Sequence, residues 1–70
     1  MRRMYRYFTV EGYDKSAALS QLLIDNMIAH YIHPVDDKNI VIVVSDLYQP
    51  LYEGIYQEIL KLVVSVRDEV

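Results

Sequence analysis

Two groups of residues could bind a partner through charge and aromatic surface. In the N-terminal segment cationic and aromatic side chains alternate, and further along the chain tyrosines recur every four residues. Arginine neutralises phosphates, and tyrosine stacks on bases or fills protein interfaces. We take both groups as candidate partner-binding residues: Arg2, Arg3, Tyr5, Arg6, Tyr7, Tyr48, Tyr52 and Tyr56.

Both groups also have a structural interpretation. Arginines on an edge strand discourage unwanted pairing with other strands. Tyrosines at helical spacing can cover the core of their own domain. Three rings on one helical face are nevertheless more aromatic surface than a short helix needs, and aromatic anchors dominate many interfaces. We therefore expect the tyrosine stripe to contact another chain.

Two histidines and two aspartates have the residue types of a metal site. His30 and His33 stand three residues apart, which places them on one face of a helix, and Asp36 and Asp37 follow. The histidines are explained more simply as residues at a helix C-terminus, where the helix dipole favours a protonated imidazole. We predict no metal and no other cofactor.

Catalytic signatures are missing from the sequence. Glu11 and Asp46 follow the two expected strands, and in a parallel sheet both carboxylates would lie at the end where α/β folds bind ligands. Asp46 is more simply a helix N-cap. Two glycines cannot build a phosphate-binding loop, and the absence of cysteine excludes a thiol nucleophile. We predict no catalytic residues and no enzyme.

Composition limits the protein class. The chain has 70 residues, of which 53% are hydrophobic and 24% charged, which argues against disorder. A chain of this length buries only about 60% of its surface, so a second copy could cover the excess apolar area. No apolar run approaches the roughly 18 residues of a membrane span, and the lack of cysteine favours a cytoplasmic protein.

The charge is unevenly distributed along the chain. The net charge is −3, yet residues 1–10 carry three arginines and no acidic residue. The rest of the chain is therefore acidic, which opposes binding of nucleic acid anywhere except at the first strand.

The first half of the chain reads as strand, helix, strand. Residues 3–10 alternate, with Arg6, Phe8 and Val10 on one face and Tyr5 and Tyr7 on the other. A helix capped by Asp14 or Ser16 is expected to run to about Ile32, because Pro34 ends it. Residues 40–44 are apolar on both faces, which is typical of a buried central strand.

The second half predicts one long helix. The apolar positions from Pro50 to about Val66 fit a period of 3.6 residues, and this helix is the interpretation we favour. Alternation over residues 60–66 leaves a third strand as the alternative. The expected fold is one small α/β domain over residues 1–70, in the order β-α-β-α. Its short, mostly parallel two-stranded sheet would be completed to four strands by homodimerisation.

These features favour a small cytoplasmic protein-binding protein, regulatory or inhibitory, that acts by occupying a surface and without catalysis. Accessory proteins of phages and mobile elements are the class we expect. The expected partners are a second copy and an unidentified protein, with no membrane. The alternatives are a nucleic-acid-associated regulator that uses the N-terminal Arg/Tyr strand and, least favoured, a small metal- or ligand-binding enzyme.

Overall fold

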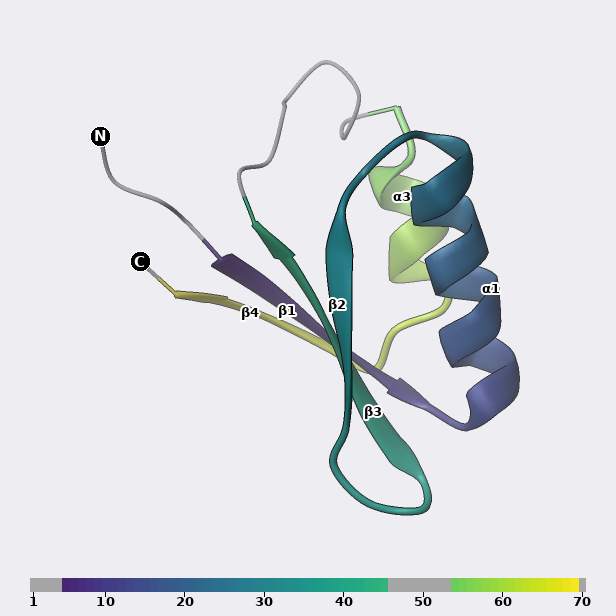
Figure 1. Cartoon of the computed structure of the whole chain (residues 1–70), viewed down its shortest axis with the longest axis vertical. Coiled ribbons are helices and arrows are strands. Elements are labelled where there is room, and N and C mark those ends of the chain that lie inside the picture. The colour runs from purple at the N-terminus through teal and green to yellow at the C-terminus, as the bar shows by residue number, and fades with distance from the viewer. Residues whose placement is uncertain (1–4, 46–53, 70) are drawn as a thin grey trace.

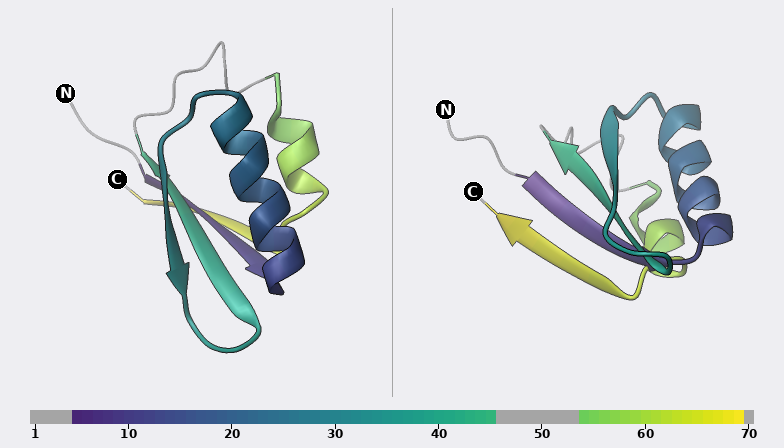
Figure 2. Two further views of the ribbon diagram at one scale, coloured as in Figure 1. Left: turned by 45° about the vertical axis from the view of Figure 1, so that its right-hand side comes forward. Right: turned by 60° about the horizontal axis from the view of Figure 1, so that its bottom comes forward.

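Four strands and two helices make up the described part of the chain. The computed structural model describes residues 5–45 and 54–69. The elements follow in the order β1 (Tyr5–Glu11), α1 (Tyr13–Asp25), β2 (His30–Pro34), β3 (Asn39–Ser45), α3 (Tyr56–Leu60) and β4 (Ser65–Glu69). Figure 1 shows α1 and α3 side by side on one face of the sheet, and the two views of Figure 2 agree.

The sheet is antiparallel, with the strand order β2-β3-β1-β4. The expected mostly parallel sheet is therefore wrong. The two strands foreseen from the sequence do pair, as β1 and β3, but β2 reverses the chain between them. The β-α-β-β-α-β order with interleaved strands is the split arrangement of ferredoxin-like folds. Because the chain supplies all four strands, sheet completion gives no reason for a dimer.

Helix α1 ends earlier than the sequence predicts. Its last turn is closed by two hydrogen bonds, from Met27 N–H to the Ile24 carbonyl at 3.0 Å and from Ile28 N–H to the Leu23 carbonyl at 2.8 Å. This is the Schellman motif, whose left-handed residue is usually glycine. Here Met27 takes that position with φ of 59°. Because the sequence has no glycine here, it predicts no stop, and β2 falls within the predicted helix.

The start of α1 also differs from the expectation. The helix begins at Tyr13 after Gly12, and no side chain caps it, so neither Asp14 nor Ser16 is the N-cap. Gly12 has φ of 89° and ψ of 153°, a conformation that is essentially restricted to glycine. Its carbonyl accepts from Ser16 N–H at 3.2 Å, and its own N–H donates to the Lys38 carbonyl at 2.7 Å.

The favoured long helix in the second half is wrong in its described part. Helix α3 ends at Leu60, and Ser65–Glu69 pairs with β1 as strand β4. The alternative of a third strand in this region is correct in kind, although the strand begins at Ser65 instead of residue 60. The proposed cap Asp46 and the start of the helix at Pro50 lie outside the described residues.

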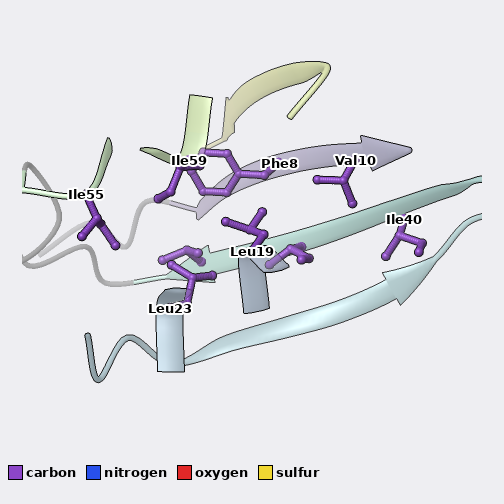
Figure 3. Packing of buried hydrophobic residues seen from close by; sticks show 9 residues of the cluster. Phe8, Val10, Leu19, Leu23, Ile40, Ile55 and Ile59 are labelled. Carbon is purple, nitrogen blue, oxygen red and sulfur yellow. The ribbon is translucent and has the colours of Figure 1, made fainter. Parts of the chain in front are cut away.

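The core lies between the sheet and the helices. It takes alternate residues of β1 and β3, so the two faces expected of β1 are confirmed for the described residues. The central position expected of β3 is also confirmed, whereas β1 is not the edge strand that its arginines suggest, because it lies between β3 and β4. Helix α1 contributes Leu19 and Leu23, and Ile59 enters from α3 (Figure 3). The fully buried side chains are Phe8, Val10, Leu19, Leu23, Ile40, Ile42, Val44 and Ile59. Within residues 5–45 and 54–69 neither helix has the length and apolar content to cross a bilayer.

Candidate binding face

The sheet face opposite the helices, called the open face below, carries an aromatic row. The strand registers place Tyr31, Val43, Tyr7 and Arg67 side by side, one from each of β2, β3, β1 and β4. Cross-strand neighbours on one face of an antiparallel sheet lie about 5 Å apart, so these side chains form a continuous band. The band spans the full width of the described sheet.

Arg67 and Tyr7 interact at one end of this row. The guanidinium carbon of Arg67 lies 4.9 Å from the centroid of the Tyr7 ring, within cation–π range. Arg67 Nη2 also lies 3.5 Å from Glu69 Oε2, and 72% of the Arg67 side chain stays exposed. A partner could displace the Arg67 guanidinium from the Tyr7 ring or stack upon it.

The other end of the row is aromatic and uncharged. Tyr31 is 63% exposed, whereas Val43 beside it is only 8% exposed. The neighbouring rows of the open face add small, polar and apolar side chains. They contain Tyr5 and Glu69 on one side of the aromatic row, and Thr9, Val41, His33 and Ser65 on the other.

Arg6 lies on the opposite face, where it is engaged within the domain. Its Nη2 donates to Asp68 Oδ2 at 2.7 Å, and its Nε donates to Asp68 Oδ1. The guanidinium carbon also lies 5.6 Å from the centroid of the Tyr56 ring. The hydrogen bonds from Arg6 hold the pKa of the Asp68 carboxyl below its ordinary value. Arg6 therefore ties β1 to β4 and to α3.

The candidate binding residues are thus divided between the two faces. Tyr5 and Tyr7 lie on the open face, as the alternation predicts. Arg6 and Tyr56 lie on the helix side, where Tyr56 is half-buried and packs against the core. The remaining candidates, Arg2, Arg3, Tyr48 and Tyr52, lie outside the described residues.

The expected metal candidates do not converge. His30 and His33 belong to strand β2, where residues three apart point to opposite faces, so the helical spacing argument fails. Asp36 Oδ1 instead accepts from the main-chain N–H groups of Lys38 and Asn39, at 2.8 and 2.7 Å, and closes the β2–β3 turn. The Asn39 amide, then that of Lys38, holds the pKa of Asp36 below its ordinary value. The described residues contain no group of three potential metal ligands.

Ser20 and His30 form a pair with the spacing of a nucleophile and its base. Ser20 Oγ lies 2.7 Å from His30 Nε2, and His30 Nδ1 lies 3.0 Å from the Ile28 carbonyl. That carbonyl can only accept, so Nδ1 carries a proton, and in the neutral ring Nε2 accepts from the Ser20 hydroxyl. Ser20 lies inside α1, where main-chain N–H groups bond within the helix and none remains to hold an oxyanion. The pair joins α1 to β2.

Glu11, the other carboxylate considered for acid–base chemistry, forms an ion pair. Its Oε2 lies 3.2 Å from Lys38 Nζ at the surface. Its proposed partner Asp46 is outside the described residues. Through this ion pair Glu11 links the end of β1 to the β2–β3 turn.

Two residues of the aromatic row were not anticipated from the sequence. The predicted first helix includes Tyr31, and Arg67 lies just beyond the end of the predicted second helix. The alternation of Tyr31, Ile32 and His33 before Pro34 was the available signal for β2, since proline is tolerated on edge strands. Arg67 had no comparable signal, because the polar strand β4 has no apolar alternation to recognise.

Known proteins match this chain in fold and not in sequence. No protein-family model matches it, and no curated protein matches it. It is similar to the crystal structure of the divalent ion tolerance protein CutA1 from Ehrlichia chaffeensis, with a TM-score of 0.58 and 12% identity over 97% of this chain and 79% of that one.

Two further solved structures show the same similarity. The de novo designed protein Ferredog-Diesel has a TM-score of 0.61 and 12% identity, over 99% of this chain and 85% of that one. The structured domain of Drosophila melanogaster Boca has a TM-score of 0.55 and 17% identity, over 99% and 97%. The chain is therefore a small α+β domain with a four-stranded antiparallel sheet and two helices, and the similarity extends to the fold alone.

Proposed function

We propose that this chain is a small protein-binding domain without catalytic activity, and that it covers a partner's surface with the open face of its sheet. The observation that supports this is the row of Tyr31, Val43, Tyr7 and Arg67 on the face away from both described helices. Tyrosine and arginine are enriched at protein interfaces and at their energetic centres. A cytoplasmic location, a regulatory or inhibitory role and a second copy as one partner complete the proposal.

Two features favour a protein partner over nucleic acid. The two glutamates of the open face, Glu11 and Glu69, each pair with a neighbouring cation, Lys38 and Arg67, and the chain has a net charge of −3. The described face therefore offers no net positive charge to a phosphate backbone, whose contacts dominate the affinity of nucleic-acid binding. The nucleic-acid alternative has one specific observation in its favour. Aromatic side chains on the face of a four-stranded sheet stack bases in RNA-recognition modules.

The lack of catalysis rests on the side chains that come close together. Within residues 5–45 and 54–69 the Ser20–His30 pair has no oxyanion donors beside it, and the carboxylate of Glu11 is paired with Lys38. Neither arrangement places a nucleophile, a base and a charge-stabilising group around one substrate position. Binding by surface contact requires none of these.

Affinity capture from the organism that encodes the chain tests the proposal. The wild-type protein and a Tyr7→Ser variant are compared, with Ser65→Lys as the control on the same face but outside the aromatic row. We expect proteins retained by the wild type to be lost with Tyr7→Ser and kept with Ser65→Lys. Equal retention by all three would overturn the open face as the binding surface.

Fluorescence anisotropy with labelled single-stranded RNA separates the two partner classes. A protein-binding domain should show no salt-dependent increase in anisotropy at micromolar concentration. Binding that weakens steeply with salt and is abolished by Tyr7→Ser would replace the protein partner with nucleic acid.

A further inference from the structure

The outer edge of β2 offers main-chain hydrogen-bonding groups. Val35 N–H donates to the Asn39 carbonyl at 2.9 Å. This bond shows which residues of β2 turn their main-chain groups toward β3. In an antiparallel pair, alternate residues turn their main-chain groups toward and away from the partner strand. Tyr31 and His33 therefore bond to β3, whereas His30 and Ile32 direct their N–H and C=O groups outward. In the described sheet no strand lies beyond β2.

The two edges of the sheet differ in their protection. Strand β4 carries Arg67, Asp68 and Glu69, and charges of this kind keep other strands away. Strand β2 carries no Lys, Arg, Asp or Glu, and its Tyr31 and Ile32 are 63% and 47% exposed. An edge without Lys, Arg, Asp or Glu and with outward hydrogen-bonding groups is a template for another strand, and the one proline of β2, Pro34, stands at its end and keeps its carbonyl as an acceptor.

Helix α1 extends this uncharged surface above the edge. The Ser20–His30 hydrogen bond shows which flank of α1 borders β2. Residues one turn apart share a flank, so Tyr13, Ala17 and Ile24 lie in line with Ser20, and both Tyr13 and Ile24 are exposed. The nearby acidic residues of α1, Asp14 and Asp25, fall on the outer side of the helix.

Met27 adds an observation that is independent of the edge. Its side chain is 89% exposed, and its backbone has φ of 59°, a conformation that costs a methionine energy and a glycine none. Backbone strain of this kind persists where the surrounding structure holds the residue in place, and it recurs at functional sites. Met27 leads into β2, so it lies at one end of the uncharged surface.

We propose that β2 pairs antiparallel with β2 of a second copy of this chain, about a two-fold axis at Ile32. Each Ile32 then exchanges main-chain hydrogen bonds with the partner's Ile32, and His30 N–H donates to the carbonyl of the partner's Pro34. The two sheets become continuous, and the two α1 helices meet along their Tyr13, Ala17 and Ile24 flanks.

The second copy is the occupant that the strand chemistry favours. An antiparallel pair of identical strands is self-complementary, as a two-fold interface requires. On β2 it places no Lys, Arg, Asp or Glu opposite another, whereas an axis at Arg67, the middle residue of β4, would put that arginine opposite its own copy. This proposal specifies how the second copy named in the proposed function binds. It uses the edge of the sheet and not the open face, so its failure would leave the binding of a protein partner to the open face standing.

Sedimentation equilibrium tests the dimer with three proteins. The wild type should have twice the 8.3 kDa mass of one chain at micromolar concentration. Ile32→Lys, which places a charge on the paired edge, should be monomeric at the same concentrations. Ser65→Lys adds the same charge at the opposite edge and should stay dimeric, as should Tyr7→Ser on the open face.

Amide hydrogen exchange tests the same contact in the wild type, without relying on a variant that could fail to fold. The Ile32 amide points away from β3, and the described sheet has no strand beyond β2, so we expect its protection to come from the strand of a second copy. We expect slow exchange at high concentration and fast exchange on dilution. A wild-type monomer of 8.3 kDa at all concentrations, a dimer that Ile32→Lys leaves intact while folded, or an Ile32 amide that is never protected would each overturn the proposal.

Discussion

Arg67 covers Tyr7 on the open face, with its guanidinium carbon 4.9 Å from the ring centroid. The two residues belong to neighbouring strands, β1 and β4, and are directly paired in the register. The same two strands are joined on the other face by Arg6 and Asp68. The sheet thus has one arginine that is tied into the domain and one that is presented to solvent.

Replacing Arg67 with Gln should change binding more than folding. Its side chain is 72% exposed, and exposed substitutions usually change the free energy of unfolding by at most about 0.5 kcal/mol. Urea unfolding checks this value, and the capture experiment checks partner retention, which we expect to fall. A destabilisation as large as that of Arg6→Gln would show that the cation–π contact is structural.

Arg6→Gln should destabilise the domain by about 1 kcal/mol, the upper end for an ion pair that solvent still screens. The side chains of Arg6 and Asp68 are 18% and 43% exposed, so the pair is only partly shielded. Urea unfolding of Arg6→Gln, Asp68→Asn and the double variant provides the measurement. If the two single effects add in the double variant, the two residues do not act as a pair.

The same pair predicts how stability depends on pH. The pKa of Asp68 is lower in the folded chain than in the unfolded chain, so the unfolded state binds more protons in acid. The contribution is complete above the unfolded pKa of about 4 and is lost as pH falls through the folded pKa. This fall in the free energy of unfolding at low pH is called the acid limb below. Asp68→Asn and Arg6→Gln should each flatten it, as measured by the free energy of unfolding at a series of pH values.

Part of the acid limb should remain in both variants. The lowered pKa of Asp36 contributes in the same direction through the turn amides. An acid limb that is unchanged in Asp68→Asn would refute the assignment to the Arg6–Asp68 pair. A limb that is flattened only when Asp36 is also replaced would assign it to the turn.

Met27→Gly should be more stable than Met27→Ala by about 1 kcal/mol, because only glycine adopts the left-handed region without a steric cost. Both variants remove the exposed side chain, so the difference between them reports the backbone at φ of 59° and not any contact of the thioether. At an ordinary helical position the order is reversed. Thermal unfolding that ranks alanine above glycine would contradict the Schellman stop at this residue.

The periodicity of the sequence was sufficient for the central part of the fold. Alternation identified β1 and its two faces, and the run of Ile and Val identified β3 as a central strand. Helix α1 was recognised, but its end was not, because Met27 replaces the glycine that usually marks a Schellman stop. One missed strand, β2, then inverted the inferred direction of β3 and changed the sheet from antiparallel to parallel.

Only part of the open face can be predicted from the sequence, because the favoured interpretation contains neither β2 nor β4. Tyr5 and Tyr7 follow from the alternation in β1, whereas Tyr31 becomes a surface residue of the sheet only once β2 is a strand. Arg67 requires β4, whose exposed polar residues carry no periodic signal. The sequence groups Arg6 with the candidate binding arginines, because its partner Asp68 is distant in sequence and only the sheet brings the two together.

Hydroxyl-radical footprinting of the captured complex tests the open-face assignment most directly, because it reports which tyrosines the partner covers. The free chain and the complex are compared at Tyr7, Tyr31 and, as the control on the helix side, Tyr56. We predict that the reactivity of Tyr7 and Tyr31 falls in the complex, while that of Tyr56 is unchanged. Unchanged reactivity at Tyr7 and Tyr31 in a complex that is demonstrably formed would contradict the proposal that the open face is the binding surface.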